Sequence, residues 1–529
     1  MPESTDSRFT RRVGLFTIGT LVSRLLGLVR ESVFAYLFGA GMATDAFNVA
    51  FRIPNFLRDV FAESALSAAF VPAFVDSLNR EDRQRTWRFA SSIATVLGLA
   101  LLLIVVLGII FAPQVVRVVA LGFADEPAKF NLTVALTRIM FPFLLFVALA
   151  AWAMGILNAC GTFFTPAVAP AAFNIFSALV PLLAYGWLRS RGVNPIAGMA
   201  WGVTIGALAQ FLIQLPALAA HGFRFRPVLD LKDERLRRVF TRWTPVVLGF
   251  ASWQVSALVN TFLLAFLPEG SVTWVNYAYR IQHLPAGLFG AAIGTVALAE
   301  FSHAATAAAA SVRQRFRHAM GLVSVLTLPA AMILVALAVP VVRLVYQHGR
   351  FTTMDTAFTA QALALYSLGI WAAAAARNCA AGFFSLGDTR TPALAAAGSV
   401  ALNIALNLLL MRRIGFLSFP LVTSLTQLAY FAVLFGLLRR RTGGLEGRAV
   451  VSVAVRALVA ALVAAAGALL VALGFENLFS LRPLWSRLLQ VTLAGGLGLI
   501  IFYLTALALH LDEVRAAFRD LIHSGKTPA

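Results

Sequence analysis

The chain has 529 residues, of which 60% are hydrophobic and only 12% are charged, with a formal net charge of +20. A soluble domain has about 25% charged and about 45–50% apolar residues, so this composition excludes a soluble enzyme, a disordered chain and a nucleic-acid-binding domain. Its two cysteines are too few for a disulfide framework or a Cys-based zinc site. With a mean hydropathy of +0.83, the chain is expected to be a polytopic membrane protein.

Charge clusters and Gly or Pro turns divide the chain into fourteen candidate membrane helices, each near the ~20 residues that cross a bilayer. We place them at 12–38, 43–75, 88–112, 130–158, 163–188, 195–219, 243–267, 272–301, 317–342, 356–385, 390–411, 415–438, 449–473 and 485–510. The first has no small-residue cleavage pattern after it, so we do not expect a cleaved signal peptide. The expected fold class is an all-α polytopic membrane protein with about 14 transmembrane helices.

The positions of Lys and Arg predict the orientation of these helices. If the amino terminus is cytoplasmic, the cytoplasmic segments hold 25 Lys and Arg residues and the opposite side holds 10. We therefore expect both termini to be cytoplasmic. The stretch 224–242 mixes basic residues with Leu, Val and Phe, and is predicted to be an interfacial amphipathic helix that links two halves.

Two short passages recur at nearly one spacing. NVAFRI at 48–53 returns as NYAYRI at 276–281, an offset of 228, and GTFFTPA at 161–167 returns as GDTRTPA at 387–393, an offset of 226. Two matches at one spacing indicate a duplicated six-helix unit in parallel orientation, an arrangement found in secondary transporters. The expected domains are an N-lobe at 1–222, an amphipathic linker at 223–242, a C-lobe at 243–441, and two further helices with a tail at 442–529.

Eight arginines lie inside or at the edges of the predicted spans, where a charge should face a cavity or a partner. They are Arg24, Arg30, Arg52, Arg58, Arg138, Arg280, Arg377 and Arg456. In the second helix, a spacing of three or four residues places Asp45, Asn48, Arg52, Asn55 and Asp59 on one face. The repeat-related face carries Thr273, Asn276, Arg280 and His283, and we expect the two faces to look at each other across a central cavity.

Arginines outnumber acids in this predicted cavity, whose acids are Glu31, Asp45, Asp59 and Glu63. A permanently charged guanidinium suits bidentate binding of phosphate, so the excess predicts an anionic, phosphate-bearing substrate. The alternative is that the arginines only pair with these acids or extend to the interface. We favour that alternative for Arg138 and Arg456 and leave it open for Arg52.

Several kinds of chemistry have no matching motif. The chain contains no Walker A loop, no HExxH pair and no GxSxG elbow. We therefore expect no catalytic residues, no metal site and no cofactor. Asn260, Asn403 and Asn407 could line a pore, but the sequence leaves ion coupling undetermined.

Several longer passages in order carry a family resemblance. They are SRLLGLVRE at 23–31, FGAGMATDAF at 38–47, PNFLR at 54–58, FAE at 61–63, YAYR at 277–280, QHGRFT at 347–352, GFFS at 382–385 and TP at 391–392. With these passages the chain resembles the MurJ (MviN-type) lipid II flippase family of the multidrug/oligosaccharidyl-lipid/polysaccharide exporter superfamily. The resemblance implies two six-helix lobes around a cavity, and a groove for the polyprenyl tail on the last two helices.

The resemblance also implies that lipid II moves from the inner to the outer leaflet of the bacterial cytoplasmic membrane by alternating access, for cell-wall synthesis. The family's functional arginines fall on Arg24, Arg30, Arg58 and Arg280, and its acids on Glu31, Asp45 and Glu63. Tyr279 stands where some members have an acid. The expected partners are lipid II, membrane lipids and other cell-wall synthesis proteins. The alternatives are a flippase for another polyprenyl-linked glycan, or a multidrug exporter of the same superfamily.

Overall fold

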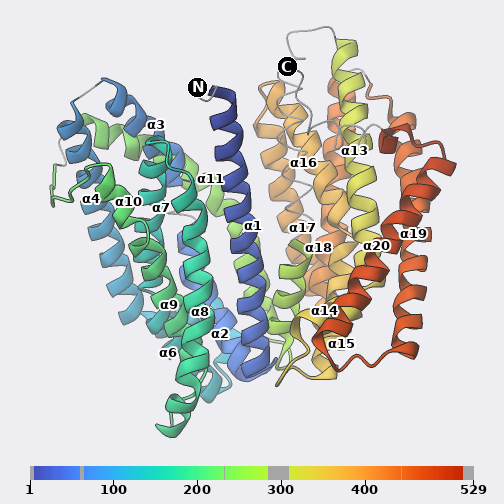
Figure 1. Cartoon of the computed structure of the whole chain (residues 1–529), viewed down its shortest axis with the longest axis horizontal. Coiled ribbons are helices and arrows are strands. Elements are labelled where there is room, and N and C mark those ends of the chain that lie inside the picture. Colours follow the sequence, from blue (N-terminus) through green and yellow to red (C-terminus); the bar gives the residue numbers. More distant parts are fainter. Residues whose placement is uncertain are drawn as a thin grey trace. The chain divides into compact units, whose positions relative to one another are not determined.

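The computed structural model describes residues 5–59, 65–80, 82–230, 233–283, 309–442 and 444–515, and these residues form helices joined by short links, with no strand among them. The chain divides into two compact units, Met1–Thr273 with His348–Phe351, and Trp274–Gln347 with Thr352–Ala529. Figure 1 colours the helices of the first unit blue to green and most of those of the second yellow to red. The expected all-helical membrane fold is confirmed.

The first unit is built from helices of 3 to 34 residues that pack against their neighbours. They are α1 (Thr5–Phe38), α2 (Met42–Arg58), α3 (Ala65–Arg80), α4 (Arg83–Ile110), α5 (Ala112–Val119), η2 (Leu121–Phe123), α6 (Pro127–Met140), α7 (Phe143–Ala159), α8 (Phe164–Ser190), α9 (Ala197–Leu212), α10 (Leu215–Ala220) and α11 (Glu234–Leu264). The helix α8 packs against both α1 and α9. Buried aromatic side chains, among them Phe74, Phe89 and Trp152, fill the core between α3, α4 and α7.

The second unit starts at Trp274, inside a helix that begins at residue 271 and is described to residue 283. Its other helices are α13 (Ala309–Ala336), α14 (Ala338–Tyr346), α15 (Thr353–Ser367), α16 (Ile370–Ser385), α17 (Arg390–Ile414), η3 (Gly415–Leu417), α18 (Ser418–Arg441), α19 (Gly447–Leu478) and α20 (Leu484–Ala508). Fully buried Ala457, Ala461, Ala464 and Ala468 lie on α19, which packs against α13 and α20. Small residues allow such close approach between membrane helices.

A polar cluster fixes one end of α19 and α20 to α14. The Glu476 carboxylate of α19 accepts a hydrogen bond from Arg343 of α14, and Gln490 of α20 also donates to it at 3.3 Å. The Arg487 guanidinium donates to the carbonyl of Gln347 at 2.7 Å. The last two helices are therefore part of the second unit.

Helices occupy every predicted span within the described residues, although some spans are broken. The predicted 43–75 helix contains α2 and α3, and 130–158 divides at Pro142 into α6 and α7. Among the described residues, nine helical stretches are long and apolar enough to cross a membrane, and one of them, Arg390–Arg441, contains both α17 and α18. The number of fourteen spans stays a prediction.

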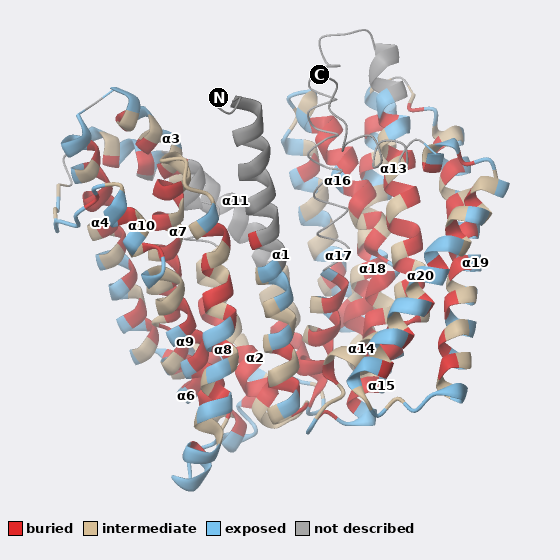
Figure 2. Ribbon diagram, in the orientation of Figure 1, coloured by how far each residue is buried: buried red, intermediate tan, exposed pale blue. Residues whose placement is uncertain are grey.

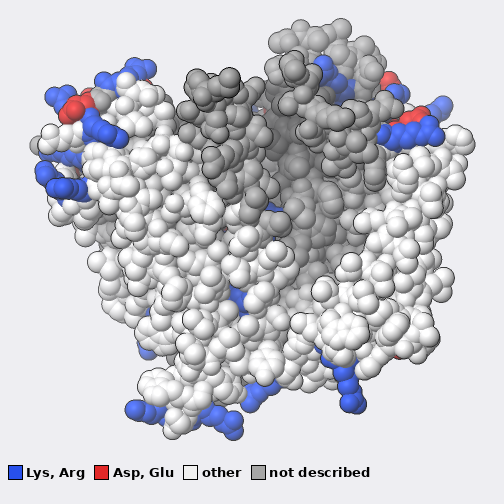
Figure 3. Space-filling model, viewed as in Figure 1, with Lys and Arg blue, Asp and Glu red and all other residues white. Residues whose placement is uncertain are grey.

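The outer faces of several helices expose apolar side chains, as lipid contact requires. Leu103 of α4 is 60% exposed, and Leu470 of α19 is 70% exposed. Figure 2 shows exposed residues repeating along α4, α19 and α20. In Figure 3 charged side chains gather near the ends of the helices, and the surface between them is mostly uncharged. This distribution is typical of a protein that crosses a bilayer.

The stretch 224–242 differs from the predicted interfacial helix. Residues 223–230 form a link without regular secondary structure, and α11 begins at Glu234 and continues without a break to Leu264. The link follows α4, because the amide of Val228 donates to Thr95 Oγ1 at 3.4 Å, and the Asp233 side chain caps α11 by accepting from the amide of Arg235 at 2.8 Å. Since α11 packs against α3, α4 and α5, it belongs to the first unit, whereas we had placed it in the C-lobe.

The repeated passage around the Thr-Pro pair has the same local structure in both copies. Gly161 and Gly387 both have a positive φ, of 80° and 73°. After each glycine, an amide donates back to a carbonyl five residues earlier, from Thr162 to Leu157 and from Asp388 to Phe383. This pattern ends a helix with a left-handed residue, which explains why glycine recurs there.

Candidate substrate site

The polar face of α2 starts at a tight turn. Gly39 has a φ of +65°, and the Thr44 hydroxyl donates to its carbonyl at 3.0 Å. Asp45 and Asn48, the first two residues of the predicted polar face, are 1% and 8% exposed. Both side chains therefore lie buried inside the protein in this structure.

Asp45 binds the N-terminus of the helix that begins at residue 271. Its carboxylate accepts from the amide of Gly270 at 2.7 Å, and from the amide and hydroxyl of Thr273 at 2.9 and 2.6 Å. Asn48 donates to the same hydroxyl at 3.2 Å. The first amides of a helix have no partner within the helix, and a negative charge is favourable there. Asp45 of α2 thus provides the hydrogen-bond acceptor for free backbone amides at the N-terminus of another helix.

A second carboxylate makes the reciprocal contact. Glu269 accepts a hydrogen bond from the amide of Met42, the first residue of α2, at 2.5 Å. Met42 and Gly270 occupy corresponding positions at the repeat offset of 228, and the amide of each is bound by an acid from the other copy. The two helix N-termini therefore bind one another through exchanged carboxylates, in a pattern that follows the sequence repeat.

Lys129 of α6 is the buried cation beside this junction. Its side chain is 1% exposed, and its Nζ lies 3.9 Å from Asp45 and 3.8 Å from Glu126. The ammonium also lies 4.2 Å from the centre of the Phe123 ring, within the range of a cation–π contact. Lys129 therefore balances the charge of Asp45, which pairs with no arginine among the described residues.

Two of the predicted arginines are held by adjacent acids. Arg30 pairs with Glu31 at 2.5 Å, and Arg58 pairs with Asp59 at 2.6 Å. The Arg30 guanidinium also lies 5.3 Å from the centre of the Phe173 ring. A guanidinium has five N–H donors, so one carboxylate does not exhaust its capacity for hydrogen bonds.

The other predicted side chains of the first unit have different surroundings. Arg24 is exposed on α1 and forms no ion pair with a described residue. Arg52 is half-buried on α2. Glu63 lies outside the described residues. Arg138, for which we expected a structural role, donates to the carbonyl of Ile109 at 3.2 Å.

The second unit carries the remaining predicted arginines. Asn276 and Arg280 are half-buried on the helix that starts at residue 271, and Arg377 is exposed on α16. The Tyr279 ring lies 4.1 Å from that of His283. Arg456, the other arginine expected to be structural, donates to the carbonyls of Leu509 and His510 in this unit.

Comparison with known protein families identifies the family of this chain. The family model described as "Lipid II flippase MurJ" matches residues 34–487. The chain belongs to the MurJ family. The lipid II flippase MurJ of Burkholderia cenocepacia is 33% identical over 427 residues, which cover 80% of this chain and 82% of that protein. A probable lipid II flippase MurJ of Rhizobium meliloti is 36% identical over 405 residues, covering 74% of each chain.

Solved structures support the fold of this MurJ-family chain. A structure of "Lipid II flippase MurJ, inward closed conformation" matches with a TM-score of 0.74 and 24% identity, over 96% of this chain and 99% of that one. An inward-facing multidrug resistance MATE family transporter of the MOP superfamily matches with a TM-score of 0.63 and 14% identity, over 82% of this chain and 98% of that one. At these identities the likeness concerns the fold.

Lys129 and Glu269 are the residues of this MurJ-family chain that sequence reasoning missed. In the sequence analysis, Lys129 is only one of the ten Lys and Arg residues on the side of the membrane opposite the cytoplasm. One signal was available, because Lys129 is one of only three lysines in a chain with 43 basic residues. For Glu269, the signal was its position immediately before the helix that carries the repeated passage.

Proposed function

We propose that this chain is a lipid II flippase, a transporter that moves the polyprenyl-diphosphate peptidoglycan precursor from the inner to the outer leaflet of the bacterial cytoplasmic membrane. The observation that carries the proposal is the match to the MurJ family model over residues 34–487. The arginines on α1 and α2 support it, since a diphosphate needs charge-assisted donors.

In this proposal the arginines that bind the diphosphate are Arg24, Arg30, Arg58, Arg280 and Arg377. Glu31 and Asp59 hold Arg30 and Arg58 in position while the site is empty, because each pair brings its charges within 2.6 Å. An arriving diphosphate then competes with the adjacent carboxylate for each guanidinium. One such charge-assisted hydrogen bond contributes about 1.5–3 kcal/mol.

The polyprenyl tail stays in lipid alongside α19 and α20, whose exposed faces include Leu470 and Ile500. Moving an apolar tail from lipid into protein would gain little free energy, because the two surroundings are equally apolar. The protein therefore has to shield only the polar head group. Both termini are placed in the cytoplasm, following the distribution of Lys and Arg.

Reconstituted vesicles that contain fluorescent lipid II test the function. The wild-type protein should accelerate exchange between leaflets, Arg24→Ala should reduce the rate at least tenfold, and the matched control Arg138→Ala should keep it. No acceleration by the wild-type protein over empty vesicles would contradict the function. A full rate for Arg24→Ala would contradict only the arginine site.

The multidrug-exporter alternative predicts transport of a cationic dye instead. Such a cargo requires acids in excess, whereas the predicted set contains more arginines than acids. The same vesicles, loaded with ethidium, distinguish the two functions.

A further inference from the structure

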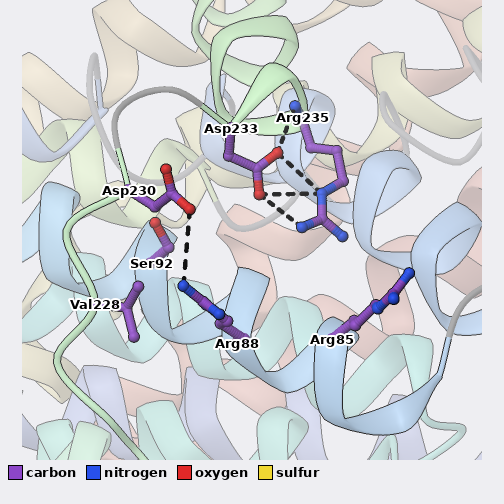
Figure 4. A pocket seen from close by; sticks show the side chains of 7 residues that line it. All are labelled: Arg85, Arg88, Ser92, Val228, Asp230, Asp233 and Arg235. Carbon is purple, nitrogen blue, oxygen red and sulfur yellow. Dashed lines mark hydrogen bonds and ion pairs between the residues drawn. The ribbon is translucent and has the colours of Figure 1, made fainter.

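A pocket at the start of α4 is separate from the proposed substrate residues. Arg85, Arg88 and Ser92 of α4 line it, together with Val228, Asp230, Asp233 and Arg235 from the link and the first turn of α11. Its volume is ≈ 380 Å³. In Figure 4 Arg88 lies beside Asp230 and Arg235 beside Asp233, and Arg85 is set apart from both pairs.

The walls of the pocket are fixed by hydrogen bonds between the link and α4. The amides of Arg226 and Val228 donate to Ser91 Oγ and Thr95 Oγ1 at 3.5 and 3.4 Å. Arg235 lies 5.1 Å from the centre of the Phe89 ring, which holds its guanidinium against α4. The pocket is therefore part of the fold and does not depend on one flexible side chain.

Three arginines and two aspartates line the pocket, so its positive charges outnumber its negative charges by one. Arg235 binds the Asp233 carboxylate through Nη2 at 2.6 Å and Nε at 3.0 Å, and Arg88 lies 4.0 Å from Asp230. Each acid thus has an arginine of its own. Arg85 is exposed and forms no ion pair with a described residue.

Ser92 gives an independent indication of a ligand. It is 2% exposed, yet its hydroxyl forms no hydrogen bond with any described residue. Ser91 and Thr95, its neighbours on α4, both accept from the link. Buried hydroxyls are almost always satisfied, so an unsatisfied one that lines a basic pocket indicates an acceptor that fills the pocket.

We propose that this pocket binds a phosphate group, with Arg85 and Arg88 as charged donors and the Ser92 hydroxyl as a third donor. The group comes either from an anionic membrane lipid or from free phosphate. Phe225 and Leu229 of the link are 55% and 60% exposed beside the pocket and give an acyl chain an apolar surface, which favours the lipid. The site goes beyond the proposed function, because it shares no residue with the substrate set.

The test uses the purified full-length protein with two probes. Native mass spectrometry measures binding of dioleoyl phosphatidylglycerol against dioleoyl phosphatidylcholine, and calorimetry measures inorganic phosphate. The variants are Arg85→Gln and Ser92→Ala. The matched control is Arg80→Gln, an arginine with a 79% exposed side chain on α3. Because the Ser92 hydroxyl forms no hydrogen bond in the part of the chain that the structure describes, Ser92→Ala should keep the melting temperature of the wild type.

We expect phosphatidylglycerol to bind in preference to phosphatidylcholine, and both variants to weaken it roughly tenfold while the control does not. If inorganic phosphate alone shows this dependence on the two variants, the pocket is a phosphate site and the source is the free ion. Equal affinities of the two variants and the control for both probes would overturn the proposal.

Discussion

Asp45 and Thr273 are joined by two hydrogen bonds, from the Thr273 amide at 2.9 Å and from its hydroxyl at 2.6 Å. The contact connects α2 to the first turn of a helix more than two hundred residues later in the chain. It buries a carboxylate that Lys129 balances at 3.9 Å. Asp45, Thr273 and Lys129 therefore depend on one another for their stability inside the protein.

Replacing Asp45 by Ala should lower the free energy of unfolding by about 3–5 kcal/mol, because it removes the buried partner of Lys129 and leaves the exposed Glu126 as its ion-pair partner among the described residues. Thr273→Val, which removes one hydroxyl, should cost about 1–3 kcal/mol. Denaturant unfolding in detergent measures both. The control is Glu126→Ala, which removes a partner of Lys129 whose side chain is 56% exposed. An Asp45→Ala protein as stable as this control would contradict the buried charge pair.

Glu31→Gln should separate binding of lipid II from its transport. The change frees Arg30 from its ion pair at 2.5 Å, so the empty site should bind the diphosphate about tenfold more tightly and release it more slowly. Equilibrium binding and the vesicle exchange rate should therefore move in opposite directions. Asp76→Asn, which removes the exposed partner of Arg80, should change neither. Weaker binding by Glu31→Gln would contradict the competition.

Cysteine labelling should place the start of α11 in the cytoplasm. In a background without Cys160 and Cys379, Arg237→Cys should react with an impermeant maleimide only after the membrane is opened. Arg412→Cys, at the end of α17, should react in intact spheroplasts. The reverse pattern would overturn the orientation and the direction of transport.

Gly349→Ala should destabilise the protein by more than the backbone strain alone. Gly349 has a φ of +57°, and an added Cβ would lie 2.3 Å from the carbonyl oxygen of Tyr36. Gly387 has a φ of +73° but open space around the same position, so Gly387→Ala reports strain alone, about 1 kcal/mol. Melting temperatures of the two variants compare them. Equal shifts in the two melting temperatures would show that the structure relieves the contact with Tyr36 without loss of stability.

The Asp233 cap should give the protein a pH-dependent contribution to stability. Hydrogen bonds from the Arg235 side chain lower the pKa of Asp233 in the folded state. The unfolded chain, with an ordinary Asp pKa of about 3.9, therefore takes up this proton first as the pH falls. The stabilisation is present above that value and is lost as the pH falls through the lowered folded pKa.

Melting temperatures from pH 7 to pH 3 test this contribution. The difference between the wild type and Asp233→Asn should be largest at pH 7 and should narrow below about pH 4. Asp512→Asn, a carboxylate whose side chain is 87% exposed, is the control. A difference that stays constant with pH would contradict the cap.

Hydropathy and the positions of charges were sufficient to predict the fold class. Apolar runs near 20 residues must form helices in a bilayer, because lipid offers no partner for free backbone groups. The repeated passages at 161–167 and 387–393 indicated a duplication, and in the structure the glycine of each passage has a positive φ at a helix end. In α2, helical periodicity placed Asp45 and Asn48 on one face.

Tertiary structure decided which partner each polar side chain has. Periodicity gives the face of a residue but not the element that packs on it. It placed Asp45 on one face with Arg52, and the structure places Asp45 beside Thr273 and Lys129. The 224–242 stretch was expected to be one amphipathic helix, but residues 224–230 are not helical, and their amides form hydrogen bonds with α4. Contacts between residues far apart in the chain decide both outcomes, and no local pattern of the sequence contains them.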